Sequence, residues 1–252
     1  MDLLETGIEY RHPWELSRNG CIIKTILPYL NETRRTAADI GCGDLFFTET
    51  FAAFFDGEIY AVDTGFTGDA SGENLNEHTT DKHPSITKLH NISRLADNSI
   101  DIAILMDVLE HIENQKEFLT QLSAKLSKEA IIFITVPAYQ HLFSEHDTFL
   151  KHYRRYNKKS LSAVLTGSGF RVERIFYFYS MLYILRLVQF ITTRLIKSNR
   201  MAGNISQWNK SETSKSTKII KSLLNLDFRF NRQLGRLSLF GLSLFAICRV
   251  NV

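Results

Sequence analysis

Two glycines and an acidic residue, each at the end of a short apolar run, have the spacing that most clearly indicates chemistry in this chain. Gly41 and Gly43 stand in "AADIGCGD", directly after the first run. Glycines at a turn from strand to helix let the backbone turn tightly and let a ligand approach without meeting a Cβ atom. Asp63 ends the next run, "IYAVD", 20 residues after Gly43. A carboxylate there accepts hydrogen bonds from both hydroxyls of a ribose, so the pattern predicts an adenosyl-binding site.

The turn lacks one residue that a dinucleotide-binding turn requires. Such a turn has a third glycine three residues after the second, and Phe46 occupies that position here. The missing glycine argues against a nicotinamide-dependent oxidoreductase and favours an adenosyl ligand that needs no pyrophosphate cradle. We interpret Cys42, between the glycines, as a small apolar residue of the loop. The cysteines Cys21, Cys42 and Cys248 form no C-x-x-C pair, so we expect neither a disulfide framework nor a metal site.

The segments "DIGCGD", "AVD" and "DNSIDIAILMDVLEHI", in this order and at these spacings, resemble the class I S-adenosylmethionine-dependent methyltransferases. The resemblance covers residues 35–180 and is to the small-molecule branch, methyltransferase types 11 and 12. It implies S-adenosylmethionine as the cofactor. It also implies a set of cofactor-binding residues: Asp39, Gly41, Cys42 and Gly43 under the methionine part, Asp63 at the ribose, Asn91 and Ile92 near the adenine, and Asp107 and Leu109 at the end of the fourth strand. This chain has Asn91 where the family usually has an aspartate.

A second polar segment, residues 136–157, follows the fifth expected strand. It holds three histidines, an aspartate, three tyrosines and two adjacent arginines. The catalytic candidates are His146 as the preferred general base, Asp147 beside it, and His152 as the second choice. In the alternative interpretation, "HYRRY" begins a solvated helix, with Arg154 and Arg155 paired to acids or bound to an anionic substrate group. The segment resembles a methyltransferase subgroup associated with lipid-linked or polyketide-type acceptors.

The elements that must position these residues are a parallel sheet and its helices. "HPWELSRNGCIIKTILPYL" predicts an N-terminal helix that ends or kinks at Pro28. Short apolar runs then alternate with helical patterns up to residue 137, which is typical of βαβ units. Residues 64–89 are polar and predict a long loop. The predicted fold is α/β: a Rossmann-like, doubly wound, mostly parallel seven-stranded sheet with an antiparallel last strand and a helical insertion before it.

The expected domain boundaries follow from two late strands, "FRVERIFYFYS" and "LFGLSLFAICRV", which would close the sheet as a hairpin. Residues 1–180 would form the N-terminal helix and core, 181–238 a basic amphipathic insertion, and 239–252 the last strand. The first insertion helix would place Arg186, Gln189, Thr193 and Lys197 on one face, and Ile184, Val188, Ile191 and Leu195 on the other. A second helix is expected over 218–237.

Charge is concentrated in the insertion. The chain has a net charge of +3, yet residues 181–236 carry 11 Lys or Arg against 2 Asp or Glu, whereas residues 1–180 carry 18 against 25. Basic amphipathic helices fit an anionic membrane surface or a cover over a long apolar acceptor. The alternative is a helical lid packed on its own domain or on a second subunit of a homo-oligomer. Nucleic acid is not expected, because the sequence shows no base-reading module.

These observations predict a methyltransferase for a small hydrophobic, aromatic or carrier- or lipid-linked acceptor. A likeness of "RHPWELSR" to methyltransferases of bacterial aromatic polyene pigment pathways suggests a phenolic ring and a role in natural-product biosynthesis. The beginning of the sequence lacks a signal-peptide pattern, so we expect a cytoplasmic protein. If the basic insertion binds membrane rather than forming a lid, the protein would be peripheral on the inner membrane face. A non-catalytic membrane-associated binding protein and an NAD-dependent oxidoreductase stay open as alternatives.

Overall fold

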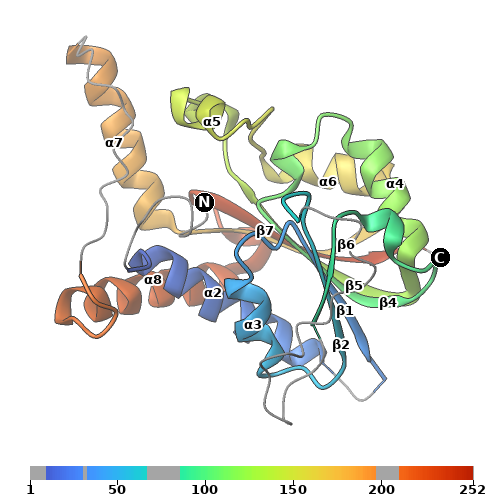
Figure 1. Cartoon of the computed structure of the whole chain (residues 1–252). Coiled ribbons are helices and arrows are strands. Elements are labelled where there is room, and N and C mark those ends of the chain that lie inside the picture. Colours follow the sequence, from blue (N-terminus) through green and yellow to red (C-terminus); the bar gives the residue numbers. More distant parts are fainter. Residues whose placement is uncertain (1–9, 31–32, 67–85, 197–209, 252) are drawn as a thin grey trace.

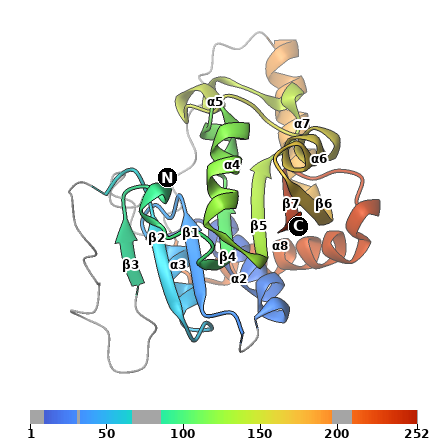
Figure 2. The ribbon, with the colours of Figure 1, turned by 90° about the vertical axis from the view of Figure 1, so that its right-hand side faces the viewer.

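The computed structural model describes residues 10–30, 33–66, 86–196 and 210–251. Its centre is a seven-stranded sheet with the strand order β3-β2-β1-β4-β5-β7-β6 (Figures 1 and 2). Only β7 runs against its neighbours, β5 and β6, so the predicted fold class is confirmed. The strands are β1 (Thr36–Ile40), β2 (Glu58–Val62), β3 (Ile86–Leu89), β4 (Ile100–Met106), β5 (Leu126–Pro137), β6 (Phe170–Phe178) and β7 (Ser243–Val250).

Helices cover both faces of the sheet, and each face has its own buried cluster. The described helices are α2 (Pro13–Ile26), α3 (Phe46–Ala52), α4 (Gln115–Lys125), α5 (Glu145–Phe149), α6 (Lys158–Gly167), α7 (Ser180–Ile196) and α8 (Lys215–Leu234). Leucines of α4 and α6 pack on one face. Helices α2, α3 and α8 cover the other face (Figure 1), and their apolar residues pack against the strands there. This burial of both faces is why the parallel strands are almost continuously apolar.

The sequence signals for α2 determine both of its ends. Pro13 occupies the first turn, where its missing N–H costs nothing, and His12 Nδ1 accepts a hydrogen bond from Trp14 N at 3.2 Å. The helix ends at Ile26, and Pro28 lies in the 3-10 turn Leu27–Tyr29 that follows. The predicted end of the helix at Pro28 is confirmed.

The prediction of an unbroken loop over residues 64–89 is wrong at its end. Ile86–Leu89 forms β3, the edge strand, which pairs in parallel with β2. The strand is only four residues long and only Ile86 is buried in it, so its residues show too little apolar alternation to be recognised. The part of this stretch over residues 67–85 lies outside the described residues.

The carboxyl ends of β1, β2, β4 and β5 meet at one edge of the sheet because these strands are parallel. The glycine turn follows β1, Asp63 follows β2, Asp107 follows β4, and the polar segment from Ala138 follows β5. Ligands of open α/β sheets bind at this edge. The topology therefore brings the predicted cofactor residues and the predicted acceptor segment to the same side of the molecule.

The two insertion helices are placed differently. Leu224 and Phe228 of α8 enter the core, and Asn225 accepts a hydrogen bond from Ser17 of α2 at 2.8 Å. The helix α8 begins three residues before the predicted start, and residues 235–237 form a 3-10 turn after it. In contrast, α7 projects away from the sheet (Figure 1). No helix in the described part of the chain is both long and apolar enough to span a bilayer.

The exposed face of α7 is its apolar one. Ile184 is 49% exposed and Val188 is 54% exposed, and the same side carries Met181, Leu185 and Ile191. Arg186 points the other way and donates from Nη2 to Ser144 Oγ at 3.1 Å. The predicted division into two faces is present over the residues whose side chains are described, which end at 192. Its apolar side faces solvent in the single chain.

Candidate functional site

The turn after β1 has the tight backbone that its two glycines predict. Gly41 has a φ of +72° and Gly43 a φ of +55°. A Cβ atom on Gly41 would lie 2.7 Å from Val108 Cγ2, so the turn packs directly against the loop after β4. Only glycine satisfies both conditions at position 41.

Asp63 holds this turn from the neighbouring strand. Its Oδ2 accepts the backbone N–H of Gly43 at 2.9 Å, and its Oδ1 accepts that of Gly65 at 2.8 Å. A carboxylate has about four acceptor positions, so each oxygen keeps one for a further donor. The carboxylate is partly exposed at the edge of the sheet.

Asp39, at the end of β1, is buried beneath the glycine turn. Its carboxyl group is buried and accepts a hydrogen bond from Thr48 Oγ1 at 2.6 Å, which ties β1 to α3. Burial raises the pKa of Asp39 to about 7. The hydrogen bond from the Thr48 hydroxyl opposes this rise, and the negative charge of Asp63 adds a smaller one. Burial also raises the pKa of the Cys42 thiol, as expected for a small apolar residue.

The raised pKa of Asp39 gives a testable pH dependence. The folded chain keeps this proton up to about pH 7, whereas the unfolded chain releases it near pH 4. The proton on Asp39 therefore stabilises the folded chain fully below pH 4. As the pH rises to 7 this contribution to the free energy of unfolding is lost, and it amounts to at most about 4 kcal/mol. We expect Asp39→Asn to flatten the free energy of unfolding over this range, measured by urea denaturation. Parallel curves for the two proteins would contradict the assignment.

Asp107, after β4, is paired with a residue that the sequence analysis did not select. Arg18 of α2 lies with Nη1 2.6 Å from Asp107 Oδ2 and donates from Nη2 to Thr135 Oγ1 at 2.8 Å. Thr135 Oγ1 in turn donates to Asp107 Oδ1 at 3.0 Å. Asp107 has a φ of +55°, an unusual value for a residue with a side chain. The N-terminal helix thus contributes a cation to the edge where the strands end.

The other predicted cofactor residues lie along the same edge. Asn91 is exposed, and its Oδ1 caps the turn Ile92–Arg94 by accepting from Ser93 N at 2.9 Å. Ile92 and Leu109 are buried in the cluster on the α4 side. They would support a ligand by packing, since neither carries a polar side chain.

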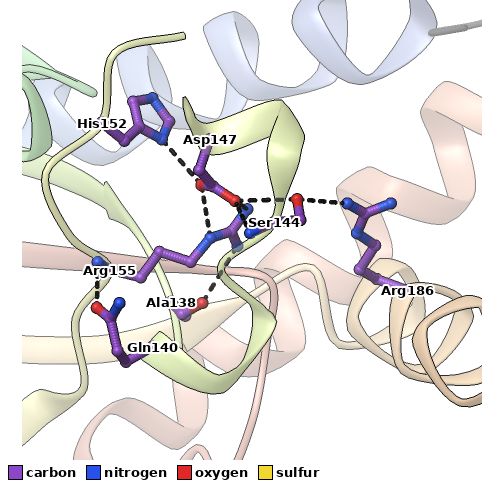
Figure 3. Close-up of polar contacts among 7 residues, drawn as sticks. All are labelled: Ala138, Gln140, Ser144, Asp147, His152, Arg155 and Arg186. Atoms are coloured by element: carbon purple, nitrogen blue, oxygen red, sulfur yellow. Dashed lines mark hydrogen bonds and ion pairs between the residues drawn. The ribbon is translucent and has the colours of Figure 1, made fainter. Parts of the chain in front are cut away.

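The acceptor segment is organised by one buried carboxylate, Asp147 (Figure 3). His152 Nδ1 lies 2.9 Å from its Oδ1, and Arg155 binds it in bidentate fashion through Nε at 2.7 Å and Nη2 at 3.0 Å. Ser144 donates its backbone N–H to Asp147 Oδ2 at 2.9 Å. Burial alone would raise the pKa of Asp147, but the hydrogen bonds from His152 and Arg155 hold it well below its usual value.

The hydrogen bonds of Asp147 distinguish the two histidine candidates. Asp147 is the sequence neighbour of His146, but its hydrogen bond goes to His152, five residues later. A helical turn, α5, separates adjacent side chains by about 100° and so directs Asp147 and His146 apart. Burial lowers the pKa of His146. Arg155 is paired to an acid, as in the alternative interpretation of "HYRRY".

Two hydrogen bonds to backbone carbonyls hold the acceptor segment against the loop after β4. Tyr153 N donates to Glu110 O at 2.8 Å, and Tyr156 Oη donates to Leu109 O at 3.1 Å. The side chains of Glu110 and His111, to which the sequence analysis gave no role, consequently meet His152. The rings of His111 and His152 are in edge contact, with their centroids 4.6 Å apart. Glu110 is fully buried, and burial raises its pKa well above the usual value.

Comparison with known proteins identifies the family. A family described as "Methyltransferase domain" matches residues 15–175, more than half of the chain. The chain therefore belongs to the methyltransferase-domain family. This membership confirms the predicted class I S-adenosylmethionine-dependent methyltransferase and S-adenosylmethionine as its cofactor. No curated protein matches the sequence significantly.

Solved structures of methyltransferases share the fold at low sequence identity. An S-adenosylmethionine-dependent methyltransferase from Archaeoglobus fulgidus is 17% identical with a TM-score of 0.50, over 92% of this chain and 94% of that one. One from Mesorhizobium loti is 13% identical with a TM-score of 0.52, over 90% and 96%. A geranyl diphosphate methyltransferase in complex with S-adenosylmethionine is 10% identical with a TM-score of 0.54, over 92% and 85%.

The residues of this methyltransferase at the sheet edge fit the cofactor. The remaining acceptor position on each oxygen of Asp63 matches the two hydroxyls of a ribose. Arg18 was not predicted because nothing in its spacing shows that α2 brings it to the carboxyl ends of β4 and β5. Glu110 and His111 directly follow the fourth strand in "MDVLEH", but their partner His152 comes from a different segment.

Proposed function

We propose that this methyltransferase transfers the methyl group of S-adenosylmethionine to a small apolar, aromatic or carrier- or lipid-linked acceptor. One observation carries the proposal: the Asp63 turn and the buried Asp147 network lie on the same edge of the sheet, joined by the loop after β4. The first fits a nucleoside, and the second offers a histidine beside it. Such an arrangement holds a donor and an acceptor close together, which is the main requirement of a displacement reaction.

The cofactor residues divide by position. Gly41 and Gly43 supply the turn on which the methionine part rests, with Asp39 anchoring it from below and Cys42 filling space. Asp63 accepts the ribose hydroxyls. Asn91 and Ile92 would hold the adenine, since they offer a side-chain amide and an apolar surface. Asp107, held by Arg18, and Leu109 form the wall on the β4 side.

On the acceptor side, His152 is the residue that faces the reacting group. When bound, the cofactor supplies an electrophilic methyl group that leaves the sulfonium sulfur as the acceptor atom bonds to it. Asp147 fixes the His152 ring through Nδ1, which leaves Nε2 for the acceptor. Arg155 keeps Asp147 ionised and oriented. His146 lies near Arg186 of α7, on the side of the segment that we assign to the acceptor.

The nature of the acceptor is inferred from α7. This helix contacts the acceptor segment through Arg186 and Ser144 and presents an exposed row of aliphatic side chains beside it. Such a row suits a long apolar or aromatic molecule, including a phenolic intermediate of natural-product biosynthesis.

The proposed activity is tested with S-adenosylmethionine labelled in its methyl group. The purified chain is incubated with phenolic, fatty-acyl and polyprenyl-linked acceptors, and the label that partitions into organic solvent is counted. We expect transfer to at least one acceptor of these classes and its loss in His152→Ala. If S-adenosylhomocysteine binds but no acceptor receives label, the proposed acceptor class is wrong.

Membrane association is a separate proposal, supported by the insertion. The exposed faces of α7 and α8 carry Leu185, Val188, Leu226 and Phe230, and α8 also exposes Lys215, Lys218 and Arg229. We expect the chain to co-sediment with vesicles that contain anionic lipid and to be released by high salt.

The double variant Leu185→Ser/Val188→Ser should reduce co-sedimentation about fivefold or more, because two exposed aliphatic side chains of α7 are removed. The matched control is Phe54→Ser, which changes an exposed apolar residue on the α3 side of the sheet. An equal loss in both variants, or no sedimentation of the wild type, would contradict a membrane role for α7.

A further inference from the structure

Three side chains with metal-binding atoms converge where the loop after β4 meets the acceptor segment. Glu110, His111 and His152 each offer one ligand atom, and these three atoms lie within 4.8 Å of one another. Two of them come from the turn Leu109–His111 and the third from the loop after α5. Two imidazoles and a carboxylate are a common ligand set for divalent first-row transition metals.

The surroundings of Glu110 indicate that this cluster can bind a ligand. The residue is fully buried, and its carboxylate oxygens have no hydrogen-bond partner among the described residues apart from its own backbone amide. A buried carboxyl group without partners is costly, so such a group in a folded protein calls for an ion, a water molecule or a proton. Two neighbouring imidazoles favour an ion, because their nitrogens and a carboxylate oxygen bind a cation together.

Both histidines are already oriented as metal ligands usually are. Asp147 holds the Nδ1 of His152, which leaves Nε2 for coordination. One ring nitrogen of His111 is hydrogen-bonded to the backbone of Leu150, which leaves the other. Metal-bound histidines typically use their second nitrogen in this way, toward a carboxylate or a backbone carbonyl. His111 is exposed, so an ion can reach it from solvent.

We propose that Glu110, His111 and His152 bind one divalent transition-metal ion at the acceptor side of the site. Three protein ligands leave coordination positions open, as in catalytic metal sites. An oxygen of the acceptor would bind at an open position, and the cation would favour the ionised form of that oxygen, whose proton goes to solvent. This use of the metal rests on the proposed function and specifies it: His152 reaches the acceptor through the ion, and the methylated atom is a hydroxyl oxygen.

Metal binding can be measured without methyl transfer. The tag-free chain is treated with a chelator, dialysed and titrated with Co²⁺, and the visible absorption of the bound ion and the heat of binding are recorded. We expect one Co²⁺ per chain with micromolar affinity and a rise in the melting temperature of several degrees. Glu110→Gln, which keeps the shape of the side chain, and His111→Ala should each weaken binding about 100-fold or more.

The matched control is His141→Ala, which removes an exposed histidine outside the cluster, whose ring lies tilted against that of Tyr139. It should bind Co²⁺ like the wild type. The inference is overturned if the wild type binds no Co²⁺, or if Glu110→Gln and His111→Ala bind it as tightly as His141→Ala does. S-adenosylhomocysteine is titrated into the same samples: binding of this ligand without binding of Co²⁺ rejects the metal site and leaves the methyltransferase proposal intact.

Discussion

Asp63→Ala is expected to weaken S-adenosylhomocysteine binding about 100-fold or more in calorimetric titration. The substitution removes the carboxylate that accepts the two ribose hydroxyls, and each charge-assisted hydrogen bond contributes about 1.5–3 kcal/mol. It also removes the acceptor of the Gly43 and Gly65 N–H groups, so the turn under the cofactor loses its support. Both effects lower the affinity for the ligand.

The matched control for this prediction is Asp56→Ala. Asp56 lies just before β2, and in the described part of the chain its exposed carboxylate makes one ion pair, with Arg35 at 3.6 Å. We expect this variant to bind S-adenosylhomocysteine like the wild type. An Asp63→Ala protein that is folded by circular dichroism and keeps its affinity within about threefold would show that Asp63 does not hold the ribose.

Asp147→Ala should produce the largest loss of stability of any single change in the acceptor segment. The carboxylate is buried and binds His152, Arg155 and Ser144. Its removal leaves the buried Arg155 guanidinium, among the described residues, with one hydrogen bond, to the backbone carbonyl of Ala138. Breaking a buried ion pair on one side costs about 3–5 kcal/mol, which urea denaturation measures as a lower midpoint.

Glu145→Ala provides the comparison, because Glu145 is an exposed carboxylate on the same short helix, α5. It should change the free energy of unfolding by less than about 0.5 kcal/mol. A similarly small effect of Asp147→Ala would show that the network does not hold the segment together. Asp147→Ala should also abolish methyl transfer, since His152 would no longer be oriented.

The cofactor side could be predicted from the sequence because its signals are local. The glycines of the β1 turn and Asp63 stand at fixed distances along a βαβ unit, and the parallel sheet brings them together without any long-range information. The edge strand Ile86–Leu89 was not predicted because its own residues carry no such local signal. It pairs on one side only, and its four residues lack the alternation that marks a half-buried strand.

The acceptor side depends on contacts that sequence spacing does not encode. Adjacency along the chain favoured His146 as the partner of Asp147, whereas the turn of α5 directs the carboxylate to His152. The meeting of Glu110 with His152 joins residues 42 positions apart through backbone contacts between two loops. The direction of the apolar face of α7 is likewise a tertiary property, since amphipathicity defines two faces but not which one meets solvent.

The most direct test of the central claim is calorimetric titration of the wild-type chain with S-adenosylhomocysteine, with NAD as the control ligand. The glycine turn and Asp63 predict binding of one S-adenosylhomocysteine per chain with micromolar affinity and no heat from NAD. Absence of S-adenosylhomocysteine binding, or binding of NAD in its place, would contradict the assignment of this edge of the sheet to the methyl donor.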